Sequence, residues 1–169
     1  MKRLLAVFLS LSCAEEQQVL PEGDNACDPK AELPGAGAQI CPGQSPVAYC
    51  ERLVGTTHTT DLLLTNRGTE QLEISDVRIV GDARCSFSPP QLDVSSIEPS
   101  FGAALVRIDY APQSPGDDLV LLEVDSNARN FPTLRIGVCG RAIAQPADAT
   151  GSCPQCLEPA TDDPACGGP

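Results

Sequence analysis

The chain has 169 residues and a formal net charge of −12, from 11 Lys and Arg against 23 Asp and Glu. A surface of this charge repels phosphate, so nucleic acid is excluded as the expected partner, and so is anionic lipid bound by charge. The length is that of one domain. Aromatic residues make up 4% of the chain and Trp is absent, so the core must be built from Val, Leu and Ile.

The first thirteen residues have the order of a bacterial export signal. A short basic start precedes an apolar run from Leu4 to Ser12, and Cys13 follows directly. This order is typical of a lipoprotein signal, after which Cys13 becomes the lipid-bearing first residue. Ser10 stands where such signals usually have leucine, so an ordinary cleaved signal peptide is the alternative. We predict a signal peptide over residues 1–12 and lipid attachment at Cys13.

The apolar run is too short for a transmembrane helix, which needs about 20 apolar residues. Glu15 and Glu16 end it early. We therefore expect a membrane-attached protein of the cell envelope, held by its lipid. Ala14 is not an aspartate retention signal, which favours the outer membrane. A secreted or periplasmic protein is the alternative.

Nine cysteines are a high number for this length. If Cys13 is acylated, an even number remains, and an even number behind an export signal indicates disulfides formed in an oxidising compartment. Their pairing stays open, although Cys41 and Cys50 enclose a short loop and could pair locally. The eight disulfide candidates are Cys27, Cys41, Cys50, Cys85, Cys139, Cys153, Cys156 and Cys166.

The composition divides the rest of the chain into three parts. Residues 13–46 are rich in Pro, Gly and acids without sustained periodicity, which predicts a flexible, disordered tether. Residues 47–144 contain short β-rich runs separated by turn residues. Residues 145–169 form an acidic tail rich in Cys and Pro, too polar to fold alone. We expect this tail to be linked by disulfides to itself or back onto the domain.

Six or seven strands at roughly 10-residue spacing predict an all-β fold. Because one sheet cannot bury both faces of these strands, we expect two sheets packed as a sandwich. The first strand, around Val47 to Val54, is poorly defined. The other strand candidates lie at 56–66, at 71–75 continued by 77–79, and at 104–110, 119–124 and 133–138. Shorter β pieces lie at 85–87 and 92–94.

Two local features refine the strand prediction. Leu72 and Ile74 have one parity, whereas Val77 and Ile79 have the other, which predicts a bulge or turn near Ser75 and Asp76. The stretch from Asn66 to Gly68 predicts a turn in which Gly68 is free to take a positive φ.

The order of these turn and core residues resembles that of ASH/Hydin-like domains, the immunoglobulin-type "choice-of-anchor" modules of exported bacterial proteins. These domains are related in shape to major-sperm-protein domains. The resemblance covers about residues 51–143. It rests on Leu64-Thr65-Asn66, Gly68, Leu72-x-Ile74-x-x-Val77, Phe87-Ser88, Ile97-x-Pro99, Ile108-x-Tyr110-x-Pro112, Gly116, Val124-x-Ser126-Asn127, Pro132 and Leu134-x-Ile136-x-Val138-x-Gly140-x-Ala142.

The resemblance implies an immunoglobulin-like β-sandwich of about seven strands that binds or supports other proteins without catalysis. It assigns a hairpin turn to Asn66 and Gly68. Pro112 and Gly116 would terminate a strand, and Gly140 would close the last one. The cysteines depart from the family pattern.

The pair Cys153-x-x-Cys156 has the spacing of a redox site or half a zinc site. The Gly- and Pro-rich flanks offer no helix N-terminus that would lower a thiol pKa, and outside the cell oxidation competes with metal. We therefore expect disulfides here. Cys139 has the parity opposite to the core residues of its strand. This parity predicts that it points outward and argues against an antibody-like bridge with Cys85 through the core.

Acidic and histidine side chains provide little evidence of a reactive site. His58 is the only histidine and has no nucleophile beside it, so a solvated strand residue is the simpler interpretation. Calcium requires six to eight oxygen ligands. The acids near one strand include Asp117 and Asp118, and alternation places Glu123 and Asp125 on one outer face. We predict no metal site, no cofactor and no catalytic residue.

The sequence thus predicts a non-enzymatic envelope lipoprotein with a protein-interaction or structural module. Its partner would be an envelope protein, bound through an exposed edge strand whose N–H and C=O groups are unpaired. The alternative is a disulfide-rich accessory or metal-holding subunit of an envelope complex that uses the tail cysteines as ligands.

Overall fold

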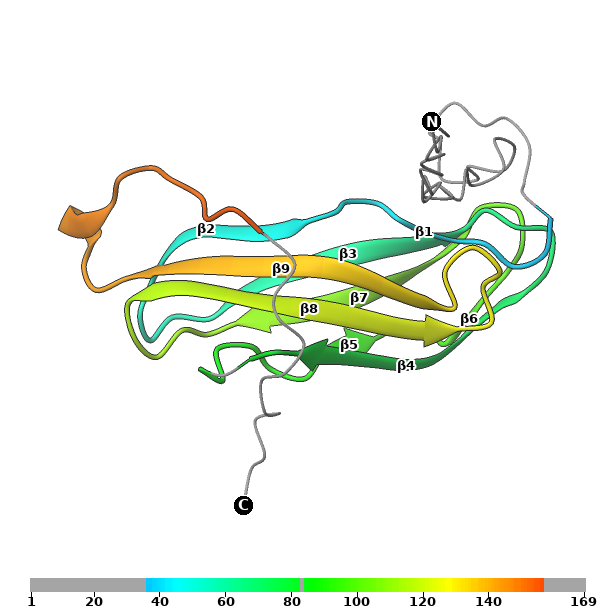
Figure 1. Cartoon of the computed structure of the whole chain (residues 1–169), viewed down its shortest axis with the longest axis horizontal. Helices are drawn as coiled ribbons and strands as arrows, with labels where there is room; N and C mark the ends of the chain where they lie inside the picture. The colour runs from blue at the N-terminus through cyan, green and yellow to red at the C-terminus, as the bar shows by residue number, and fades with distance from the viewer. Residues whose placement is uncertain (1–35, 83, 157–169) are drawn as a thin grey trace, which may run out of the picture.

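The computed structural model describes residues 36–82 and 84–156. Within them the chain forms nine strands and one short 3₁₀ helix, arranged as two facing layers (Figure 1). The strands are β1 (Ile40–Pro42), β2 (Val47–Leu53), β3 (His58–Asn66), β4 (Leu72–Val80), β5 (Gln91–Leu92), β6 (Ser96–Ile97), β7 (Gly102–Tyr110), β8 (Gly116–Ser126) and β9 (Thr133–Ile143), and the helix is η1 (Pro146–Asp148).

The layers are a four-stranded sheet of order β1-β3-β7-β5 and a five-stranded sheet of order β2-β9-β8-β4-β6. Neighbouring strands are antiparallel except β2 and β9, which run parallel. The prediction of an all-β two-sheet sandwich is therefore confirmed. The strands without a predicted counterpart are the very short β1 and β6. The predicted piece at 85–87 contributes only an isolated bridge between Phe87 and Tyr110.

The core lies between the sheets and is aliphatic, as the composition predicts. Alternate residues of β3, β7 and β9 point inward, which explains the period-2 pattern of these strands. The strand β8 is buried on both faces from Val120 to Val124 because neighbouring side chains also cover its outer face. The largest fully buried side chains include Tyr49, Tyr110, Leu62, Leu64, Ile108, Leu122 and Ile136.

The sandwich begins earlier in the chain than the sequence indicated. β1 lies inside the stretch that we assigned to the tether, and Ala38 and Ile40 are buried in the core. Asn130 holds this segment in place, because its side chain accepts a hydrogen bond from the Ile40 N–H and donates one to the Ile40 carbonyl. The expectation of a flexible tether up to residue 46 is therefore wrong for residues 36–46.

The predicted reset of parity in β4 is confirmed. The pairing of β4 with β8 shifts between Ile74 and Asp76, so one extra residue is accommodated there. Leu72 and Ile74 before the shift, and Val77 and Ile79 after it, all pack on the core. The bulge keeps both apolar pairs on the inner face despite their opposite parity.

Two roles that the sequence assigned to glycines need correction. Gly68 has no positive φ, and the turn after Asn66 is not a hairpin, because β3 and β4 belong to different sheets. A Cβ on Gly68 would lie 1.9 Å from the Gly37 carbonyl oxygen, so close backbone approach is what requires glycine. Gly140 lies inside β9, where a Cβ would lie 2.3 Å from a ring atom of Tyr110.

The chain after β9 turns back over β2 and β9 (Figure 1). Two disulfides fasten it there, one between Cys50 of β2 and Cys153, the other between Cys139 of β9 and Cys156. The local bridge between Cys41 and Cys50, which the spacing left open, does not form, because Cys50 pairs with Cys153. The predicted outward direction of Cys139 is confirmed, since its bridge lies on the outer face of β9.

Glu51 of β2 holds the returning segment by a set of hydrogen bonds. Its carboxylate accepts bonds from the Thr150 N–H at 2.8 Å, the Thr150 hydroxyl at 2.5 Å and the Gly151 N–H at 2.9 Å. The Ser152 N–H and hydroxyl also donate to it. These bonds, first that of the Thr150 hydroxyl, lower the pKa of Glu51 from 4.5 to about 2.

We expect the tail contact at Glu51 to be lost only in strong acid. Because the folded state lowers this pKa, the contact is fully present above about pH 4.5 and disappears as the pH falls through about 2. An NMR titration of the Thr150 and Gly151 amides should show this low midpoint, and Glu51→Gln should abolish the titration. A midpoint near 4.5 would contradict the contact.

Candidate functional site

One open edge of the five-stranded sheet is formed by the second half of β4. On that side β6 pairs only with Leu72 and Glu73, and the Ile74 N–H donates to the Ser95 carbonyl at 2.7 Å. Among the described residues, no strand pairs with Val77–Val80 on this side. This half of β4 therefore offers an edge to which a further strand could be added.

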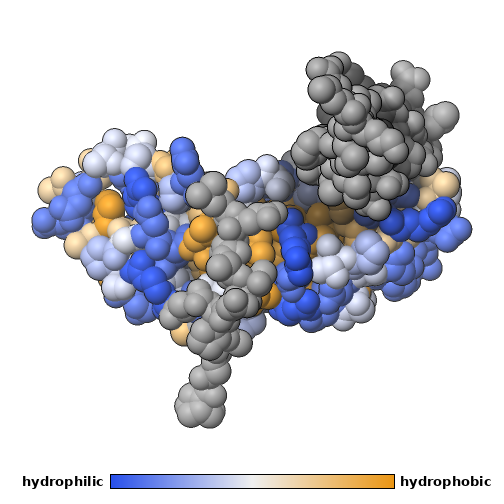
Figure 2. All heavy atoms as spheres, in the orientation of Figure 1, coloured by the Kyte–Doolittle hydropathy of each residue, from blue (hydrophilic) through white to orange (hydrophobic). Residues whose placement is uncertain are grey.

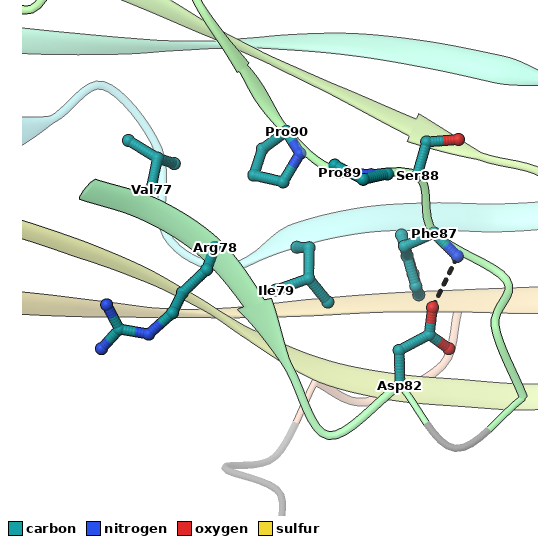
Figure 3. Close-up of a pocket in the computed structure, with 8 residues that line it drawn as sticks. All are labelled: Val77, Arg78, Ile79, Asp82, Phe87, Ser88, Pro89 and Pro90. Carbon is teal, nitrogen blue, oxygen red and sulfur yellow. Dashed lines mark hydrogen bonds between the residues drawn. The ribbon is translucent and has the colours of Figure 1, made fainter. Parts of the chain in front are cut away.

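A pocket of about 270 Å³ opens beside this edge. Val77 and Ile79 lie on the side of β4 that faces Phe87 and Pro90, whereas Arg78 extends away from them (Figure 3). The side chains of Val77 and Ile79 are only partly buried, although they pack on the core. The lining residues are Val77, Arg78, Ile79, Asp82, Phe87, Ser88, Pro89 and Pro90.

The far wall of the pocket is positioned by Asp82. Its buried carboxylate accepts bonds from the Ser86 N–H at 3.0 Å and the Phe87 N–H at 2.8 Å. Phe87 packs against Tyr110 with ring centroids 4.9 Å apart. The two contacts fix the segment that leads from β4 to β5, so the pocket is formed before any ligand arrives.

Charged side chains lie along the outer face of β4 and β8. Arg78 pairs with Asp76 at 2.7 Å and with Asp125 and Glu123 at 2.5 Å. These carboxylates, first that of Asp125, raise the pKa of the Arg78 guanidinium. Arg135 also pairs with Glu123, at 2.9 Å. Figure 2 shows that this face is mainly hydrophilic, with apolar side chains near its centre.

A second polar group lies inside the sandwich, at the end opposite the β3–β4 turn. The Tyr110 hydroxyl donates to the buried carboxylate of Asp118 at 2.8 Å, and Arg84 approaches the other oxygen of Asp118 at 3.2 Å. The Tyr49 hydroxyl donates to the Ile108 carbonyl at 2.6 Å. Burial raises the pKa of both tyrosines, and the bond to Asp118 raises that of Tyr110 further.

We expect neither tyrosine to ionise in its usual range while the protein is folded. Tyr49 and Tyr110 are the only two tyrosines and Trp is absent, so tyrosinate absorbance reports on them alone. Because both folded-state pKa values are raised, their contribution to stability is complete below about pH 10 and is lost above it. Absorbance titration of the native protein should show a midpoint above that of the protein in guanidinium. Coincident curves would contradict the burial of both hydroxyls.

The other residues that the sequence singled out do not converge on a reactive site. Cys153 and Cys156 are each in a disulfide with a strand, which leaves neither sulfur as a thiolate ligand or redox partner. Cys41 and Cys85 are disulfide-bonded as well. The lipid site Cys13 and the disulfide candidates Cys27 and Cys166 lie outside the described residues.

The acids and the histidine have local partners. Asp117 pairs with Arg141 at 2.7 Å, which lowers its pKa. Glu123 and Asp125 share the outer face as predicted, but Arg78 and Arg135 cover Glu123. In residues 36–82 and 84–156, no group of His, Cys, Asp and Glu is placed to hold a metal ion. His58 contacts the Thr56 hydroxyl at 2.9 Å, and its burial lowers its pKa.

The pocket is the feature that sequence reasoning missed. Val77 and Ile79 read as core residues of a strand, and Pro89 and Pro90 as loop residues. Nothing local indicates that β5 joins the opposite sheet and leaves half of β4 without a neighbour. The short β-rich runs on either side of Pro89-Pro90 were the only available signal.

No protein-family model matches the chain, and no curated protein matches its sequence. Among solved structures, it is similar to a protein of unknown function from Porphyromonas gingivalis, with a TM-score of 0.51 and 18% identity. This match covers 68% of the chain and 50% of that protein, so the chain spans half the length of that relative.

Two further structures are similar at lower scores. An ASH/PapD-like domain of human CEP192 has a TM-score of 0.48 and 19% identity, covering 82% of this chain and 99% of that one. The periplasmic chaperone SfaE has a TM-score of 0.43 and 19% identity, and the match covers 66% of this chain and 64% of SfaE. The fold itself is the two-sheet β-sandwich described above, and similarities at these identities give no information on function.

The disulfides provide evidence about the cellular compartment of the protein. Disulfides form and persist in oxidising compartments, so the two described bridges indicate an extracytoplasmic protein. In the part of the chain that the structure describes, no helix has the length and apolar character needed to cross a membrane.

Proposed function

We propose that the protein is a non-enzymatic lipoprotein of the cell envelope whose β-sandwich binds another protein along the free edge of β4. Two observations together carry the proposal: no described strand pairs with this edge of β4, and an apolar pocket lies beside it. An extended segment could add main-chain hydrogen bonds to the edge while an apolar side chain enters the pocket. Edge pairing supplies affinity in this binding mode, and the pocket supplies specificity.

The membrane attachment rests on the N-terminal signal and on Cys13. Its test is the intact mass of the protein isolated from membranes, before and after reduction and alkylation. A lipid mass on Cys13, with the remaining thiols appearing only on reduction, would support the proposal. An unlipidated mature chain would remove the anchor and leave a secreted or periplasmic module.

The binding edge can be tested by photo-crosslinking in the envelope of the host cell. The photoreactive residue p-benzoylphenylalanine would replace exposed Ser75, which lies next to the free edge. The matched control is the same replacement at exposed Gln113, in the turn between β7 and β8. We expect a specific crosslinked protein from position 75 and none from position 113. Equal products from both positions, or none, would contradict binding at this edge.

A further inference from the structure

The free half of β4 carries charges in an order that is complementary to itself. Asp76 and Arg78 lie on the outer face, with side chains 54% and 41% exposed, and Val77 between them faces inward. In a second copy of β4 that runs antiparallel to the first, Asp76 and Arg78 follow each other in the opposite order, so each can lie opposite the other. We propose that the β4 edge binds the β4 edge of a second copy of this chain. This proposal rests on the proposed function, because it names the protein that binds at the same edge.

Charge selects one register for this pairing. With two antiparallel β4 strands centred on Val77, Asp76 lies opposite the partner's Arg78, and Arg78 lies opposite the partner's Asp76. Side chains directly opposite each other in antiparallel strands are close enough for opposite charges to attract and like charges to repel. A pair centred on Asp76 would place Asp76 opposite the partner's Asp76, and a pair centred on Arg78 would place Arg78 opposite the partner's Arg78. Repulsion between like charges disfavours both registers.

The inner face of the same edge supplies apolar contacts. In this register Val77 meets the partner's Val77 on the side of the sheet where the pocket opens. Val77 and Ile79 are only partly buried in the single chain, so pairing removes further apolar surface from water. The pocket walls at Phe87 and Pro90 then face a second strand in place of solvent.

The pairing is expected to be weak in dilute solution. The free edge is a few residues long, so the buried area falls below the 1,000 Å² or so typical of stable interfaces. Attachment to one membrane raises the effective concentration of neighbouring modules toward the millimolar range. The pairing should therefore be measured on the full chain in membranes.

The first experiment expresses two differently tagged copies of the full chain, both with p-benzoylphenylalanine at position 75. Self-pairing predicts a crosslinked product of twice the monomer mass that carries both tags. A product with another protein would overturn the self-pairing proposal and keep the proposed function. The absence of any specific product would overturn both.

Charge reversal is the second experiment and tests the register. Asp76→Arg places like charges opposite each other at two positions of the symmetric pair, and we expect the dimer yield to fall about tenfold. Arg78→Asp should do the same. Mixing the two variants restores opposite charges at both positions, so their mixed dimer should recover most of the yield. Equal yields for all combinations would overturn the register.

The matched control is Asp61→Arg, because Asp61 also pairs with an arginine, Arg107 at 3.1 Å, but on the other sheet. It should leave the dimer yield unchanged. Arg78→Asp removes the ion pairs of Arg78 with Asp76, Glu123 and Asp125, so the fold of this variant must first be checked by circular dichroism. If it does not fold, Asp76→Arg and Asp76→Asn decide, with the neutral variant expected to lose less yield than the reversed one. A loss from Asp61→Arg equal to that from Asp76→Arg would overturn the proposal.

Discussion

Replacing Asn66 with Asp is expected to destabilise the protein by about 3 kcal/mol or more. The Asn66 side chain is fully buried and uses both ends. Its Oδ1 accepts from the Gly68 N–H at 2.9 Å, and its Nδ2 donates to the Glu70 and Ile97 carbonyls at 2.8 and 3.1 Å. A carboxylate at this position would direct a negative charge at two carbonyl oxygens without a donor between them.

The measurement is urea-induced unfolding at neutral pH. The matched control is Asn127→Asp, because Asn127 makes the same kinds of bonds, to the Glu73 N–H and the Gln71 carbonyl, but is exposed. Water solvates a charge there, so the control should cost less than about 1 kcal/mol. Burial should raise the pKa of the introduced acid at position 66. The loss of unfolding free energy caused by Asn66→Asp should therefore shrink as the pH falls and the acid becomes protonated. Equal costs for the two variants would contradict the assigned role of Asn66.

The second large effect is expected for Gly140→Ala, which should destabilise the protein by about 3 kcal/mol. The added Cβ would lie 2.3, 2.6 and 2.7 Å from three ring atoms of Tyr110. The ring is fully buried and its hydroxyl is bonded to Asp118, so it cannot retreat without breaking that bond. Both overpacking and a lost buried hydrogen bond contribute to the expected loss.

Gly137→Ala is the matched control because Gly137 lies in the same strand. A Cβ there would be 3.7 Å from Cys156 and 3.8 Å from Pro46, which is ordinary contact. Alanine should be neutral or stabilise by up to about 1 kcal/mol, since glycine weakens strands. Thermal unfolding of both variants compares them. Similar melting temperatures would show that the Tyr110 ring is not held as described.

The alternation of the long strands was sufficient to predict most of the sandwich. Apart from the outward-facing Leu105, the run 104–110 alternates apolar and polar residues, and β7 spans Gly102–Tyr110. The parity change before Val77 correctly placed the bulge of β4. These features depend on neighbours within a few residues, and the sequence records them directly.

Features that depend on distant partners could not be read in this way. β1 has three residues and no visible period, and it is a strand because β3 and Asn130 hold it. The parallel pairing of β2 with β9 joins residues about ninety positions apart. The partner of Cys50 depends on this pairing, because Cys153 and Cys156 attach to β2 and β9 side by side. The parity of Cys139 predicted its face, but no parity could predict its partner.

The bridge between Cys50 and Cys153 also determines how the molecule would respond to mechanical force. It closes a covalent loop with a sequence separation of 103, which includes all of β3 to β9. A force that enters the chain at Cys50 and leaves it at Cys153 would pass directly through the two sulfur atoms. The chain between these two cysteines would therefore not be stretched by that force, and roughly 350 Å of potential extension would stay locked until this bridge and the one between Cys139 and Cys156 are reduced.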